Sequence, residues 1–201
     1  MNLSQIISAR KKIISNAEDL IVEADILYQK KRFPRSFALA HLACEELSKL
    51  PMLNTAALNV LIGEDTDWKS INKRLSSHID KLRMSAGMDY LWSEVRFDDS
   101  DVKQFLDEVN SIPHFNKLKN ASLYAGFHNG EFLQPKEVIE KDLANNMLIL
   151  TKKRFVQYQA TENALLESFA TEEGKIKLSE MWRLVKKAQD ALKIIIKEEK
   201  A

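Results

Sequence analysis

The stretch Pro34–Lys49, with the sequence PRSFALAHLACEELSK, decides the fold predicted for this chain. Its apolar residues return every three or four positions, which is the spacing of a helix with one buried face. Proline suits the first turn of a helix, because the amide hydrogen that it lacks would have no partner there. The stretch is rich in alanine, so the backbone of a neighbouring helix can approach closely. The sequence therefore predicts a buried helix that begins at Pro34.

Three charged residues, Glu45, Glu46 and Lys49, follow this apolar stripe. Glu45 and Lys49 are four positions apart, in the order that favours an ion pair on one helical face. Glu46 points about 100° away from Glu45 at the helical period. A solvated ion pair at the end of a core helix is the simpler interpretation. The alternative is a functional site at the edge of the core, where burial and neighbouring charges change pKa values.

The rest of the chain predicts further helices within one domain that spans residues 1–201, since no repeat or low-complexity linker is visible. Pro51 is expected to kink or split the second helix, 34–62, just after Lys49. Residues 115–132 contain two glycines and several polar side chains, so we expect a partly irregular loop there. The other expected elements are helices at 3–31, 68–83, 101–112 (ended by Pro113), 136–170 and 177–197, a less regular segment at 85–100 and a turn at 171–174.

The composition favours an all-helical protein and excludes several classes. The chain has only five glycines and four prolines. The 30 Lys and Arg nearly balance the 29 Asp and Glu, so no general affinity for nucleic acid is expected, although a local basic pocket stays possible. A single cysteine, Cys44, excludes a disulfide within the chain. With no signal peptide and no apolar run of membrane-spanning length, we expect a cytoplasmic protein without membrane contact.

The motifs of several common enzyme classes are absent from the sequence. It has no His-Glu-x-x-His motif and no cysteine cluster for zinc, no glycine-rich phosphate loop and no Gly-x-Ser-x-Gly elbow. We therefore expect neither a metal ion nor another cofactor.

Polar residues at apolar edges are the remaining candidates. His78 and Lys81 are three positions apart, and an ammonium beside an imidazole favours the neutral, proton-accepting ring. Such a base suits proton transfer at a ribose hydroxyl; a surface histidine beside a surface lysine is the simpler interpretation. Lys119 and Tyr124 would place an ammonium and a phenol near a phosphate, whereas a tyrosine that tethers a loop is the ordinary alternative.

Arg35 and His41 form an Arg-x5-His pattern that resembles the Arg-x4–6-His signature of HEPN ribonucleases. His41 lies between apolar neighbours, where a buried structural imidazole is the simpler interpretation. Arg35 lies in the first helical turn, so the two side chains need not converge. Whether this pair takes the place of the usual HEPN motif stays open from the sequence.

Three motifs in order resemble the AbiV (abortive infection V) family of the HEPN superfamily. They are the alanine-rich helix that ends with EELSK at residues 45–49, the His-x-x-Lys pair of His78 and Lys81, and KNASLY at residues 119–124. The family commonly has glycine at the position of Ser48. The resemblance covers residues 34–124, and the length and helical layout also fit.

The resemblance implies an all-α, HEPN-like helical bundle with long antiparallel helices that forms a homodimer. It also implies an abortive-infection protein that halts phage multiplication by acting on RNA or on translation, as a metal-independent endoribonuclease toxin. Such a toxin needs a trigger during infection, and we expect a phage-encoded activator protein. The alternative is a non-catalytic helical module that blocks translation or senses a phage protein.

The resemblance also implies roles for the motif residues. Glu46 would orient a reacting group or take a proton from it, and His78 would act as general acid or base. Lys49 and Lys81 would hold the scissile phosphate and stabilise developing charge. The remaining residues expected to bind the substrate are Glu45, Lys119 and Tyr124.

Overall fold

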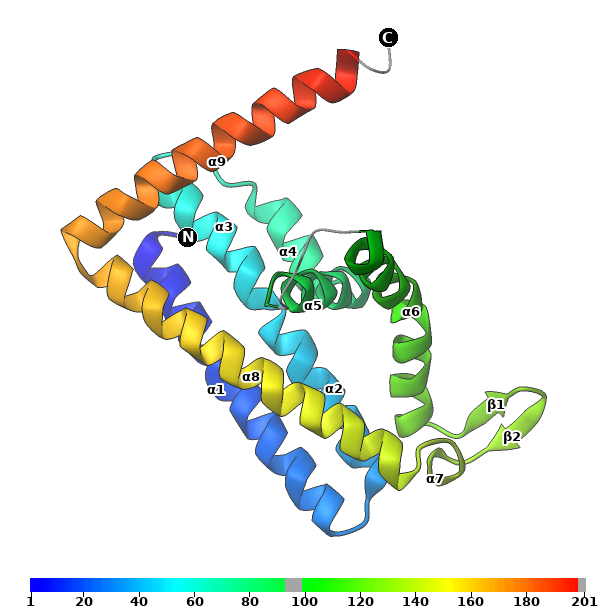
Figure 1. Cartoon of the computed structure of the whole chain (residues 1–201). Coiled ribbons are helices and arrows are strands. Elements are labelled where there is room, and N and C mark those ends of the chain that lie inside the picture. The colour runs from blue at the N-terminus through cyan, green and yellow to red at the C-terminus, as the bar shows by residue number, and fades with distance from the viewer. Residues whose placement is uncertain (93–98, 199–201) are drawn as a thin grey trace.

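The computed structural model describes residues 1–92 and 99–198, and within these ranges the protein is all-α apart from one short hairpin (Figure 1). This confirms the predicted fold class. The helices are α1 (Leu3–Gln29), α2 (Phe33–Leu47), α3 (Lys49–Leu61), α4 (Trp68–Ser76), α5 (His78–Trp92), α6 (Asp99–Leu123), α7 (Pro135–Val138), α8 (Lys141–Ala170) and α9 (Glu172–Glu198), and the strands are β1 (Gly126–His128) and β2 (Glu131–Leu133).

Helices α1 and α2 form an antiparallel hairpin, and α8 packs against both (Figure 1). The tight turn between α1 and α2 uses Lys31 in a left-handed conformation, with φ of 58°. Pro34 then lies in the first turn of α2, where its missing amide hydrogen has no cost. The hydroxyl of Ser36 donates to the carbonyl of Ala24 at 2.8 Å and ties the two helices together.

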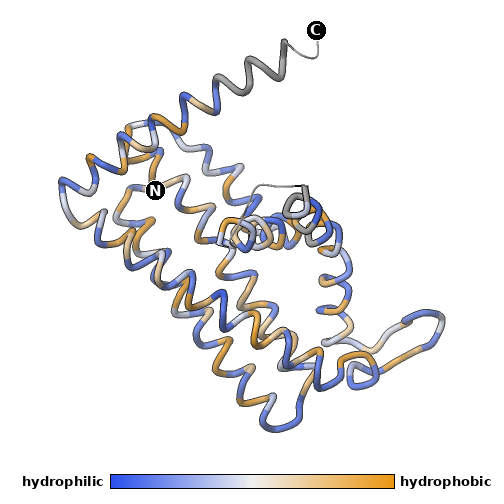
Figure 2. Tube along the Cα trace, viewed as in Figure 1, coloured by the Kyte–Doolittle hydropathy of each residue, from blue (hydrophilic) through white to orange (hydrophobic). Residues whose placement is uncertain are grey.

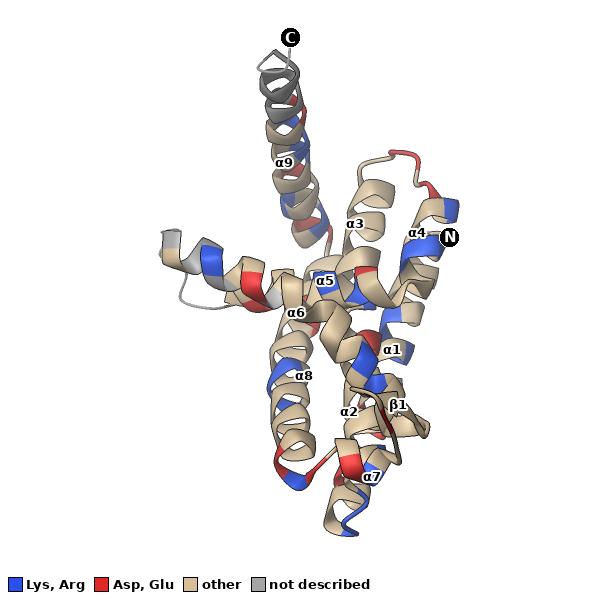
Figure 3. Ribbon diagram, turned by 90° about the vertical axis from the view of Figure 1, so that its right-hand side faces the viewer, with Lys and Arg blue, Asp and Glu red and all other residues tan. Residues whose placement is uncertain are grey.

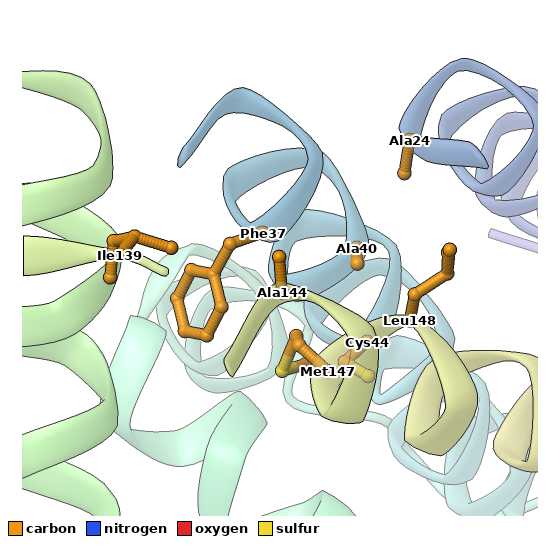
Figure 4. Packing of buried hydrophobic residues seen from close by; sticks show 8 residues of the cluster. All are labelled: Ala24, Phe37, Ala40, Cys44, Ile139, Ala144, Met147 and Leu148. Atoms are coloured by element: carbon orange, nitrogen blue, oxygen red, sulfur yellow. The ribbon is translucent and has the colours of Figure 1, made fainter. Parts of the chain in front are cut away.

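The small side chains of α2 allow this close packing. Figure 2 shows hydrophobic positions recurring at intervals along the long helices. In the core cluster of Figure 4, Phe37 and Cys44 from α2 lie against Met147 and Leu148 from α8. The buried alanines of α1, α2 and α8 in this cluster leave room for the larger side chains.

A buried ion pair links α1 to α8, and a hydrogen bond from the same arginine links α1 to α3. Arg10 donates to both carboxylate oxygens of Glu162, through Nε at 2.9 Å and through a second, shorter contact from Nη2. Its Nη1 donates to the carbonyl of Leu50 at 2.8 Å. Both charged side chains are almost completely buried, so each depends on the other for its charge compensation.

The break in the second predicted helix lies close to its expected position. Ser48 separates α2 from α3, one residue before Lys49, and Pro51 falls in the first turn of α3. Ser48 is fully buried, and its hydroxyl donates to the carbonyl of Cys44 at 2.6 Å. The same hydroxyl lies 2.5 Å from that of Ser85, which joins the break to α5.

The prediction of one helix over residues 68–83 is wrong in one respect, because the structure has two helices there, separated at Ser77. This residue is extended, with φ of −82° and ψ of 115°, and ends α4. Its hydroxyl accepts a hydrogen bond from the amide of Asp80 at 3.2 Å, as an N-cap does. The new helix α5 therefore begins at His78. The less regular segment expected at 85–100 is helical as far as Trp92, and residues 93–98 lie outside the described part.

The predicted end of a helix at Pro113 is also wrong, since α6 continues through this residue to Leu123. Proline removes one helical hydrogen bond, but α6 packs against α2 and α5 and buries Ile112 and Ala121 on either side of Pro113. Tertiary packing thus outweighs the local signal. The final helix likewise begins earlier than expected, at Glu172, so Thr171 alone separates it from α8.

The irregular loop expected at 115–132 is instead the end of α6 and a β-hairpin. Asn129 and Gly130 form the turn with φ of 52° and 92°. An Asn-Gly pair is well suited to the left-handed positions of a two-residue hairpin turn. The hairpin projects from the bundle beside the end of α6 (Figure 1). None of the described helices contains an apolar stretch long enough to cross a membrane.

Candidate functional site

Glu45 is the centre of a cluster of charged side chains from three helices. It lies at the end of α2 and is almost completely buried. One carboxylate oxygen, Oε2, accepts from Nδ1 of His78 at 2.5 Å and lies 2.7 Å from Nζ of Lys81, both on α5. The other, Oε1, accepts from Nζ of Lys119 on α6 at 3.2 Å. This carboxylate therefore joins all three motifs that the sequence singled out.

The surrounding positive charges keep Glu45 ionised. Burial by itself would raise the pKa of the Glu45 carboxyl, but the neighbouring His41, Lys81 and His78 outweigh it and hold that pKa far below its usual range. The ammonium groups of Lys81 and Lys119 are buried as well. One carboxylate thus faces two ammonium groups, so the cluster carries net positive charge even when its histidines are neutral. Such a surplus suits an anionic ligand.

The imidazole of His78 is the accessible member of this cluster. Its side chain is 52% exposed, whereas that of Glu45 is 2% exposed. An ionised carboxylate can only accept hydrogen bonds, so Nδ1 of His78 must carry a proton. In the neutral ring this leaves Nε2 as a free acceptor. Glu45 therefore selects the tautomer of a solvent-accessible base, as a buried carboxylate does in catalytic dyads.

Glu46 and Lys49 form a separate pair. Nζ of Lys49 contacts Oε1 of Glu46 three positions earlier, and both side chains are partly exposed. Across the described residues of this chain, no hydrogen bond or ion pair joins either of them to His78. Within one chain, the structure therefore does not bring Glu46 and Lys49 to the histidine. Glu45 is the carboxylate that contacts His78, because Glu45 lies on the buried face of α2 and Glu46 does not.

Arg35 and His41 do not meet in the contacts of the described residues. Arg35 donates from Nη1 to the carbonyl of Leu123 at 2.9 Å, and so satisfies a free carbonyl at the end of α6. His41 is buried one helical turn before Glu45, with its Nδ1 3.5 Å from Oε1. Burial lowers the pKa of His41 despite the neighbouring carboxylate, so the ring is neutral.

His41 also connects the cluster to a cavity of about 220 Å³ between α2, α5, α6 and α8. Among the described residues, neither of its ring nitrogens has a hydrogen-bond partner. Arg154 and Asp89, which pair through two guanidinium nitrogens, line the same cavity. Sequence reasoning missed this pair, because the two residues lie 65 positions apart on different helices and match no motif.

Tyr124 lies apart from the Glu45 cluster. It is 68% exposed and lines a surface pocket between the end of α6 and β1. Lys119 is thus the member of the third motif that enters the cluster, and Tyr124 is five positions beyond it. Among the described side chains, no three His, Cys, Asp or Glu come together as a metal site requires.

One of three comparisons with known proteins finds a match. No match was found among curated proteins or among solved structures. The family model of HEPN_AbiV, described as AbiV, matches residues 5–155, which contain α1 to α7 and the first half of α8, together with the whole Glu45 cluster. The chain therefore belongs to the AbiV family, a family of abortive-infection proteins with a HEPN domain.

Proposed function

We propose that this protein halts phage multiplication as a metal-independent endoribonuclease that is switched on during infection. One observation carries the proposal: a buried carboxylate holds a half-exposed imidazole beside two buried ammonium groups. An accessible base and a fixed positive charge are what cleavage of RNA without a metal requires. The family membership adds the biological setting of abortive infection.

The geometry suggests a role for each group. Nε2 of His78 takes the proton of a ribose 2′-hydroxyl, and the 2′-oxygen forms a bond to the adjacent phosphorus. The bond from phosphorus to the 5′-oxygen breaks, and that oxygen takes a proton from water. The products are a 2′,3′-cyclic phosphate and a 5′-hydroxyl. Lys81 and Lys119 stabilise the extra negative charge that develops on the phosphate oxygens. Glu45 acts through His78 as its positioning residue.

A homodimer is part of the proposal, and an exposed apolar surface supports it. Asp25 of α1 and Lys152 of α8 pair at 2.5 Å. Exposed aliphatic residues lie one helical turn or less from this pair, namely Val22, Ile26, Ile149 and Val156. Such side chains gain stability when a second copy covers them. A phage-encoded protein remains our expected activator, because a toxin must stay inactive in uninfected cells.

The test compares wild type with His78→Gln and with His114→Gln, which removes an exposed histidine outside the cluster. Each purified protein is incubated with total RNA and ribosomes, with and without extract of infected cells. Because a general base contributes about 10²- to 10⁴-fold, His78→Gln is expected to lose cleavage by at least 100-fold. Phage protection should be lost with it, at an unchanged Tm, whereas His114→Gln retains both. Cleavage by wild type should persist in EDTA, and its loss there would contradict a metal-independent mechanism.

A non-catalytic binding module is the second candidate, and one observation favours it. The Glu45 cluster joins α2, α5 and α6, so its ion pairs also serve to hold these three helices together. In that case the wild-type protein leaves RNA intact under every condition. His78→Gln then lowers the Tm and weakens protection only in proportion to the folded fraction.

A further inference from the structure

The hairpin exposes two phenylalanines that the fold itself does not use. Phe127 and Phe132 face each other across the two strands and are 77% and 65% exposed. Their rings lie edge to face, with centroids 5.2 Å apart and an interplanar angle of 81°. In this arrangement one ring keeps its faces open. Adjacent exposed apolar side chains often mark a binding site.

A pocket of about 490 Å³ lies between this hairpin and the end of α6. We call it the hairpin groove, and its lining includes Lys117, Asn120, Tyr124, Phe127, His128 and Asn129. Two basic groups, two amides and two aromatic rings thus surround one hollow. The described residues that line it include no carboxylate; Glu131, opposite His128 in the hairpin, lies outside the lining.

The hairpin groove and the Glu45 cluster share helix α6. Lys119 belongs to that cluster, and Lys117 and Asn120 on either side of it face the groove. From Lys119 to Tyr124 the helix rises by about 7.5 Å, which one or two nucleotides can span. Arg35, bound to the carbonyl of Leu123, adds an exposed positive charge between the two sites. Figure 3 shows blue Lys and Arg segments beside the hairpin.

These features fit single-stranded RNA better than a protein surface. Bases without a pairing partner stack on exposed aromatic rings, and neighbouring cations bind the phosphates. Side-chain amides such as those of Asn120 and Asn129 both donate and accept, as the edges of bases require. A purely apolar partner would leave these polar groups without compensation.

We propose that the hairpin groove binds an unpaired nucleobase of the RNA strand whose phosphate lies at His78, with the base stacked on the ring of Phe127, against which Phe132 packs edge to face. The inference rests on the proposed function and deepens it. It makes the hairpin a recognition element that selects single-stranded segments. Double-stranded RNA, whose bases are stacked within the helix, is a poor substrate.

The test measures binding separately from cleavage. A fluorescent 2′-O-methyl RNA, which lacks the attacking hydroxyl, is titrated in anisotropy experiments with the full-length protein. Phe127→Ala combined with Phe132→Ala is expected to weaken binding by about 5- to 100-fold, the usual effect of losing one stacked base. The corresponding double tyrosine variant should restore it. The control combines Met181→Ala with Leu184→Ala, which removes exposed apolar side chains of α9 and should bind like wild type.

An abasic strand of the same length completes the design. Wild type should bind it no better than the double alanine variant binds normal RNA. The proposal is overturned if that variant keeps wild-type affinity at an unchanged Tm, or if wild type binds abasic and normal strands equally or binds neither. It is also overturned if the rings matter for phage protection but not for RNA affinity, since they would then contact a protein. If His78→Gln still cleaves RNA while the double alanine variant loses affinity, the proposed catalytic role of His78 is refuted. The proposed binding of RNA by the hairpin groove is then retained.

Discussion

Replacing Glu45 by glutamine tests the central arrangement of this protein most directly. Glutamine has nearly the same volume, so the change removes the negative charge without leaving a cavity. Lys81 and Lys119 would then remain buried beside each other without their shared carboxylate. Removing one partner of a buried ion pair typically costs about 3–5 kcal/mol. For a chain of this length that corresponds to a fall in Tm of about 6–20 °C.

Glu46→Gln is the matched control, because it makes the same chemical change one residue further along α2. Glu46 pairs only with Lys49 in the described structure, and both side chains are partly exposed. A pair of this kind contributes at most about 1 kcal/mol. Urea unfolding followed by circular dichroism would measure both variants. If Glu45→Gln loses no more stability than Glu46→Gln, then Glu45 does not compensate the buried lysines as described.

The pH dependence gives an independent check on the same carboxylate. The folded state holds the pKa of Glu45 below the usual value of 4.5. Its contribution to stability is therefore complete above about pH 5 and is lost as the pH falls below 4.5 toward the folded-state pKa. The stability that the Glu45 carboxylate contributes over Glu45→Gln should be fully present at pH 5 and should shrink as the pH falls below 4.5. A difference that grew on acidification would contradict this sign.

Two further predictions concern the frame that holds the site. Arg10→Met should lower the free energy of unfolding by about 3–5 kcal/mol, because it leaves Glu162 buried and unpaired. Combining it with Glu162→Leu should recover most of that loss, and a double variant as unstable as the single one would show that the ion pair is not the cause. Gly174→Ala should cost about 1–3 kcal/mol, because a Cβ there would lie 2.2 Å from the carbonyl oxygen of Ser168 at the corner between α8 and α9. The change Ser168→Ala at a partly exposed position is its control, and equal Tm values for the two variants in thermal unfolding would contradict the predicted clash.

Much of the fold could be predicted because its signals are local. Apolar spacing along the chain marked α1, α2 and α8, and Pro34 marked the start of α2. The errors occurred where weak local signals competed with packing. Pro113 did not end α6, because this helix packs against α2 and α5 and buries Ile112 and Ala121. Ser77 ended α4 with its extended backbone and capped the start of α5, a break that the apolar stripe of residues 68–83 had obscured.

By itself, the sequence determined the helical class, the family motifs and the set of side chains from which a site could be built, since each depends on residues close together in the chain. Only the tertiary structure decided which carboxylate serves His78. Glu45 and Glu46 point about 100° apart on one helix, and both border the apolar stripe. The packing of α2 against α5 and α6 turns Glu45 inward to His78, Lys81 and Lys119 and leaves Glu46 at the surface with Lys49. That choice depends on contacts between residues 33 to 74 positions apart, which no local pattern records.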